Sequence, residues 1–181
     1  MKTAVVIGSG PNGLAAAITL ARAGLEVEVH EAEEQLGGGL RSAEVTLPGF
    51  VHDVCSSVHP LGLSSPLFRT LELDVDWVQP DAPTAHPLDE GTAVLLEHGL
   101  VATAAGLGRD DDAYRRLVGP LVESWREVER VLLGPHPVSP RTLFRLGDRL
   151  GARGLAAALR AGLSSARALA EGHFADQRTR A

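Results

Sequence analysis

Residues 3–31 read TAVVIGSGPNGLAAAITLARAGLEVEVHE, and this stretch decides how the N-terminal part of the chain folds. Residues 3–8 are mostly apolar and rich in β-branched side chains, a pattern typical of a strand buried on both faces in a parallel sheet. Helical spacing follows from Pro11 to Ala23, where proline is tolerated in the first turn and Gly24 acts as a stop signal. Residues 25–30 alternate apolar and polar side chains and predict a second strand. Strand, helix and strand together have the length of a βαβ unit.

Gly8, Gly10 and Gly13 form the pattern G-x-G-x-x-G between the first strand and the helix. The first glycine permits a tight turn, the second lets a pyrophosphate approach the backbone, and the third lets helix and strand pack closely. Pro11 and Asn12 complete the loop and open the helix, whose N-terminus favours an anion. We therefore predict a dinucleotide site here. The alternative is a glycine-rich turn without a ligand.

Glu31 ends the second strand, where an acidic side chain accepts hydrogen bonds from the ribose hydroxyls of an adenosine. An acid there repels a 2′-phosphate, which argues against NADP and leaves FAD or NAD. The segment that follows reads E-x-x-x-x-x-G-G-x-x-R-S and contains Gly37, Gly38 and Arg41. The glycines keep the backbone close to a ligand, and the planar guanidinium can pair with phosphate oxygens. A flexible surface loop with a solvated arginine is the alternative.

The rest of the chain predicts a mixed β region and then helices. We expect strands over 43–47, 74–78 and 93–97, turns at Pro48-Gly49 and at 89–91, and a helix over 66–73. We expect further helices over 110–133, 139–150 and 154–170, and a frayed tail over 171–181. Asp110 is expected to cap its helix and Pro120 to kink or divide it. The fold class is α/β, with a Rossmann-like region over residues 1–80 and a largely helical region over 81–181.

Composition excludes several classes of protein. Seventeen basic against 23 acidic side chains give a net charge of −6, which leaves no basic footprint for nucleic acid. Cys55 is the single cysteine, and no Cys/His spacing suits a metal. A catalytic Cys55 paired with His52 or His59 is disfavoured because no oxyanion-hole motif accompanies it, so no catalytic residue is assigned. Apolar stretches are too short to span a membrane and no export signal is evident, so we expect a cytoplasmic location.

Residues 5–60, from VVIGSGPNGLAAAITLARAG to VHDVCSSVHP, resemble the N-terminal region of FAD-dependent oxidoreductases of the phytoene desaturase and amine oxidase superfamily. Within that superfamily they are most similar to the phytoene dehydrogenase-like group, and a weaker similarity persists through residues 110–133. The resemblance implies FAD as the cofactor and a flavin-mediated dehydrogenation of an apolar or amine substrate. It implies FAD contacts at the glycines, the acid and the arginine named above.

Members of that superfamily are much longer and end in a second FAD-contacting segment that this sequence lacks. The resemblance therefore implies an N-terminal portion with an incomplete substrate domain. The alternative is a catalytically inactive nucleotide-binding fragment or a regulatory protein. An NAD-dependent dehydrogenase is disfavoured because no catalytic His or Lys pairing follows. Apolar faces of the C-terminal helices are expected to be exposed and to permit self-association.

Overall fold

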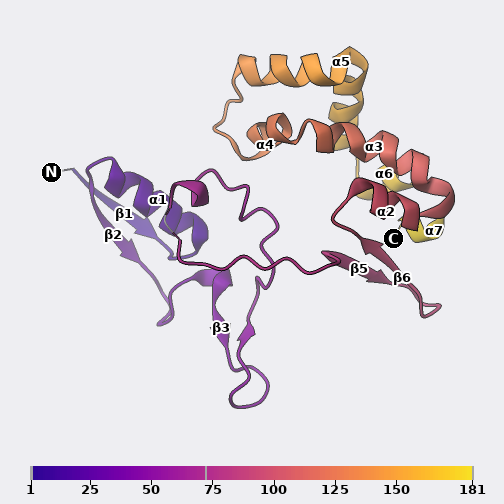
Figure 1. Cartoon of the computed structure of the whole chain (residues 1–181). Coiled ribbons are helices and arrows are strands. Elements are labelled where there is room, and N and C mark those ends of the chain that lie inside the picture. Colours follow the sequence, from indigo (N-terminus) through magenta and orange to yellow (C-terminus); the bar gives the residue numbers. More distant parts are fainter. Residues whose placement is uncertain (1, 72, 181) are drawn as a thin grey trace. The chain divides into compact units, whose positions relative to one another are not determined.

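The computed structural model describes residues 2–71 and 73–180. The chain divides into two compact units, Met1–Glu72 and Leu73–Ala181 (Figure 1). In the first unit, β1 (Thr3–Ile7) and β2 (Glu26–His30) pair in parallel, and α1 (Pro11–Arg22) connects them and packs on both. The helix ends at the predicted place, since Gly24 follows it with a φ of +85°. The predicted βαβ unit and the α/β class are confirmed.

The prediction that the first strand is buried on both faces is wrong for the described residues. Ala4 and Val6 are half-buried on the side of α1, whereas the side chains between and after them are exposed, 60% for Val5 and 87% for Ile7. Within residues 2–71 and 73–180, β1 pairs with β2 alone, and α1 covers one face of this pair. The apolar run of β1 therefore has one face covered by α1, and its other face is exposed.

The remainder of the first unit is less regular than the sequence predicts. The strand expected over 43–47 is only the two residues of β3 (Ser42–Ala43), which pair antiparallel with β4 (His52–Asp53) across the predicted Pro48-Gly49 turn. The helix expected over 66–73 is a single 3-10 turn, η2 (Phe68–Thr70), and its expected residue 72 lies outside the described residues. Arg22 at the end of α1 donates to the Thr70 hydroxyl and carbonyl, at 3.1 and 3.0 Å, and so fixes this turn from outside.

The second unit begins with a hairpin. Residues 73–80 form no strand, so the strand predicted over 74–78 is wrong. The strand predicted over 93–97 is confirmed as β6 (Ala93–Leu96), which pairs antiparallel with β5 (Thr84–Pro87) around the predicted turn. The buried Thr103 hydroxyl bonds the backbone N–H and C=O of Glu97, which ties α2 (Leu100–Gly106) to the hairpin.

Helices make up the rest of the second unit. The helical stretch predicted over 110–133 divides after Pro120 into α3 (Asp111–Glu123) and α4 (Trp125–Leu133), preceded by the 3-10 turn η3 (Gly108–Asp110). Next, α5 (Pro140–Leu163) begins at the predicted Ser139, whose side chain caps it, and is interrupted at Gly151 by φ +66° and ψ 171°. The interruption falls between the two helices predicted here, over 139–150 and 154–170. The second of them ends at Leu163 instead of 170, and a separate helix, α6 (Ala166–His173), begins after the Ser165 cap.

The C-terminal tail is ordered rather than frayed up to the last described residue. It continues beyond α6 into α7 (Gln177–Arg180), and residue 181 lies outside the described residues. Asp110, only 3% exposed, accepts hydrogen bonds from the backbone N–H groups of Ala175 and Asp176 at 2.9 and 2.8 Å. The predicted role of Asp110 as a side-chain cap of its own helix is wrong, because its carboxylate is used by this distant segment.

Candidate dinucleotide-binding site

The first glycine loop joins the carboxyl end of β1 to the N-terminus of α1. Gly8 donates its N–H to the carbonyl of His30 at 2.7 Å and has a φ of +93°, so the turn begins as soon as the parallel pairing ends. Gly10 is the N-cap, without a side-chain cap, and its carbonyl accepts from Leu14 N at 3.0 Å. Since Pro11 has no N–H, the N–H groups of Asn12 and Gly13 are the first-turn donors with no acceptor inside the helix. They form the kind of helix N-terminus that attracts phosphate.

The three glycines of this loop differ in what surrounds them. A β-carbon on Gly13 would overlap the carbonyl oxygen of Gly8 and lie 3.7 Å from Val6 Cγ1, so this position is required for packing of helix against strand. A β-carbon on Gly10 would meet no atom within 4 Å. The space above Gly10 is therefore free for a ligand group, which fits the pyrophosphate of a dinucleotide.

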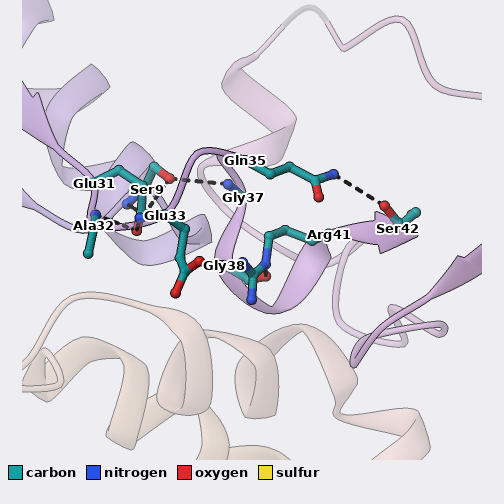
Figure 2. Close-up of polar contacts among 9 residues, drawn as sticks. All are labelled: Ser9, Glu31, Ala32, Glu33, Gln35, Gly37, Gly38, Arg41 and Ser42. Atoms are coloured by element: carbon teal, nitrogen blue, oxygen red, sulfur yellow. Dashed lines mark hydrogen bonds and ion pairs between the residues drawn. The ribbon is translucent and has the colours of Figure 1, made fainter. Parts of the chain in front are cut away.

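Glu31 is fixed by donors from two directions (Figure 2). Its Oε2 accepts from the backbone N–H of Ser9 at 2.8 Å and from the Ser9 hydroxyl at 2.6 Å. Its Oε1 accepts from the backbone N–H groups of Ala32 and Glu33 at 2.8 and 3.1 Å. These hydrogen bonds, the Ser9 hydroxyl above all, lower the pKa of Glu31 from 4.5 to about 2. The carboxylate is therefore an anion next to the first glycine loop over the whole physiological pH range.

The second glycine segment lies against the first. Gly37 donates its N–H to the Ser9 hydroxyl oxygen at 3.1 Å and has a φ of +110°, and Gly38 has a φ of +56° at the start of η1 (Gly38–Leu40). A β-carbon on Gly38 would lie 3.1 Å from the Cα of Gly10. The glycines that the sequence separates by nearly thirty positions thus meet backbone to backbone, which is the close approach that residues without side chains allow.

Arg41 follows this segment and is bound to it. Its Nε donates to the carbonyl of Gly38 at 3.0 Å, and its Nη1 lies 3.7 Å from Glu33 Oε2 (Figure 2). The guanidinium is therefore fixed near the glycine segment and retains further N–H donors. Its role toward a phosphate stays a prediction.

The loop that contains Cys55 also borders the second glycine segment. The backbone N–H groups of Val54 and Ser56 donate to the carbonyls of Arg41 and Gly39, at 2.9 and 3.0 Å. Cys55 lies beside Gly39 and is exposed. The Nε2 of His52 lies 2.7 Å from the Thr46 hydroxyl, so this imidazole contacts a neighbour other than the thiol.

The structure brings the predicted site residues to one end of β1 and β2, with Gly8 to Gly13, Glu31 and the 37–41 segment within one unit. Sequence reasoning missed Ser9, which is fully buried and contacts both Glu31 and Gly37. It occupies a variable position of the G-x-G-x-x-G pattern, so the pattern itself gives no signal for it. Among the described residues no group of three or more His, Cys, Asp or Glu side chains could hold a metal ion.

Comparison with known proteins supports this geometry. A family model described as an NAD(P)-binding Rossmann-like domain matches residues 6–72. This stretch is therefore similar in sequence to Rossmann-like domains. The chain is also 60% identical, over 52 residues, to the hydroxysqualene dehydroxylase of Rhodopseudomonas palustris, an alignment that covers 29% of this chain and 12% of that protein. It is 33% identical, over 97 residues, to the 1-hydroxycarotenoid 3,4-desaturase of a Flavobacterium species, covering 51% of this chain and 20% of that protein.

These matches confirm the predicted resemblance to the phytoene desaturase and amine oxidase superfamily. The chain spans a fifth or less of the length of the two relatives. The matched Rossmann-like domain contains both glycine segments, Glu31 and Arg41. No helix among the described residues is both long and apolar enough to cross a membrane.

Proposed function

We propose that the Rossmann-like domain binds the ADP half of FAD and that the protein is an FAD-dependent oxidoreductase acting on an apolar small molecule. One observation carries the proposal: the free N-terminus of α1, the Glu31 carboxylate and the 37–41 segment meet at the first glycine loop, where Gly10 leaves open space. The positive end of the α1 dipole, which suits a pyrophosphate, and the Glu31 carboxylate, which suits a ribose, lie at the same end of the sheet. Dinucleotide recognition requires both groups there.

Each proposed contact follows from a group that the fold fixes. The N–H groups of the first helical turn bind the pyrophosphate over Gly8, Gly10 and Gly13, with Pro11 and Asn12 forming that turn. Glu31 accepts from the adenosine ribose. Gly37 and Gly38 permit close backbone approach, and Arg41 pairs with phosphate oxygen. When bound, FAD supplies the hydride-accepting isoalloxazine, and the protein supplies position and electrostatics.

The choice of substrate class rests on the relatives. The names of both enzymes refer to hydroxylated apolar hydrocarbons, hydroxysqualene and a hydroxycarotenoid, and neither refers to an amine. Of the two substrate classes that the sequence left open, we therefore favour the apolar one. In this proposal residues 1–80 form the FAD region and the helical region over 81–181 is part of a substrate domain. Exposed apolar side chains on α5, Phe144 at 77% and Leu163 at 89%, also support self-association through this region. The proposed location is cytoplasmic.

Absorption spectroscopy of the purified 181-residue chain with FAD tests the cofactor. We expect flavin bands to stay with the protein through gel filtration and to be lost in Gly10→Val, whose side chain fills the open space above the loop. Gly99→Val is the matched control, because Gly99 is also an extended N-cap glycine with open space around it, in the other unit. If the protein stays colourless but binds NAD, NAD replaces FAD in the proposal. If it binds neither dinucleotide, the proposal is overturned.

A further inference from the structure

The hydrogen bonds of Glu31 leave no acceptor site for a ligand. An ionised carboxylate offers about four lone-pair sites. Ser9 N–H, Ser9 O–H, Ala32 N–H and Glu33 N–H fill that number, at 2.6 to 3.1 Å. A ribose hydroxyl that donates to Glu31 must therefore replace one of these donors.

The four donors differ in their freedom to move. Three are backbone N–H groups, which the β-strand end and the first glycine loop hold in place. The fourth is the Ser9 hydroxyl, whose hydrogen turns about the C–O bond without any movement of the chain. Its oxygen stays anchored meanwhile, because it accepts from Gly37 N–H at 3.1 Å.

We propose that Ser9 is a positioning residue of the adenosine-ribose subsite, whose hydroxyl aims the Glu31 carboxylate and then yields its own hydrogen bond to an arriving ribose hydroxyl. The inference rests on the proposed dinucleotide function. Ser9 is fully buried, so water does not compete for its hydroxyl in the absence of a ligand. The residue also joins the first glycine loop, Glu31 and the second glycine segment (Figure 2). Aiming the acceptor and keeping the two segments in contact are thus tasks of one side chain.

The test compares ADP with 2′-deoxy-ADP by titration calorimetry on the full chain. A ribose hydroxyl that donates to a well-aimed carboxylate is expected to give wild type about a tenfold preference for ADP. In Ser9→Ala the preference is expected to fall to about twofold or less, because Glu31 Oε2 then keeps only the Ser9 backbone N–H as a donor and can turn away from the ribose. Ser42→Ala is the matched control, since its hydroxyl donates to the Asp53 carboxylate at 2.7 Å, and its preference is expected to stay near wild type.

Two further measurements separate positioning from folding. Ser9→Gly removes the same hydroxyl and is expected to give the same reduced preference. In a Glu31→Gln background, adding Ser9→Ala is expected to change the preference no further, because Ser9 acts through that carboxylate. A wild-type preference retained in folded Ser9→Ala or Ser9→Gly overturns this inference and leaves the proposed function intact. Failure of wild type to bind ADP overturns the proposed function and this inference with it.

Discussion

The backbone of Gly13 passes so close to the carbonyl oxygen of Gly8 that a β-carbon at position 13 would overlap that oxygen. The contact holds the first turn of α1 against the end of β1. Both residues belong to the segment that the sequence marks most clearly, and their closeness explains why glycine is needed at position 13 even before any ligand is considered.

Gly13→Ala is therefore expected to destabilise the first unit by about 3 kcal/mol, since the overlap is with backbone, which cannot turn aside. Gly10→Ala, where a β-carbon meets nothing within 4 Å, is the control and is expected to change stability by less than about 1 kcal/mol. Urea unfolding followed by circular dichroism compares the two. Equal midpoints would contradict the packing role assigned to Gly13.

The second glycine segment allows a similar comparison. Gly38→Ala places a methyl group 3.1 Å from Gly10 Cα at a φ of +56°, a conformation that costs a residue with a side chain about 1 to 2 kcal/mol. Gly39→Ala is the control, because its methyl group would meet Cys55 at an ordinary 3.8 Å. We expect Gly38→Ala to weaken ADP binding by about tenfold and Gly39→Ala to leave it within about twofold. Calorimetric titration measures both, and equal affinities would show that the two segments need not touch.

The Glu31 carboxyl gives stability a pH dependence of known sign. Its pKa is lowered from 4.5 to about 2 in the folded protein, chiefly by the Ser9 hydroxyl. A carboxyl with a lowered pKa contributes stability that is fully present above about pH 4.5 and is lost as the pH falls toward 2. Urea midpoints of wild type are expected to fall across this window more steeply than those of Glu31→Gln. Parallel profiles for the two proteins would contradict the assignment.

Asp110 is expected to control the order of the C-terminal segment. Its buried carboxylate receives the N–H groups of Ala175 and Asp176, and these bonds, that of Ala175 first, lower its pKa. Asp110→Asn keeps the shape of the side chain but replaces one acceptor oxygen with an NH2 group, which cannot accept a hydrogen bond from the backbone N–H of Ala175 or Asp176. We expect hydrogen exchange at positions 175 and 176 to accelerate on the order of tenfold or more. Asp112→Asn, an exposed neighbour, is the control, and protection that persists in Asp110→Asn would show that the segment is held by other contacts.

Local signals predicted the βαβ unit and the two glycine segments, because apolar periodicity and glycine spacing act over a few residues. The similarity to a Rossmann-like domain follows from them, and so does the place of Glu31 directly after the second strand, but the contact of Glu31 with the first glycine loop was not predicted. Ser9 was missed because its role depends on partners 22 and 28 residues away.

Contacts distant in sequence decided the elements that were predicted wrongly. The turn at Phe68–Thr70 is held by Arg22, 48 residues earlier, so helical spacing over 66–73 was a poor guide. Alternation over 74–78 did not produce a strand, since a strand also needs a partner edge. The prediction that the tail frays is wrong because the tail is held by Asp110, 65 residues earlier, and no residue within the tail indicates that contact.

Arg41 carries its own counterion in the form of Glu33, 3.7 Å away and 67% exposed. An anion that reaches the guanidinium therefore exchanges with a carboxylate instead of meeting an unpaired charge. Displacing such an exposed partner costs less than about 1 kcal/mol, so the exchange is easy in either direction. In the empty loop the charge of Arg41 is therefore already balanced by Glu33, within a segment that the Gly38 carbonyl also holds.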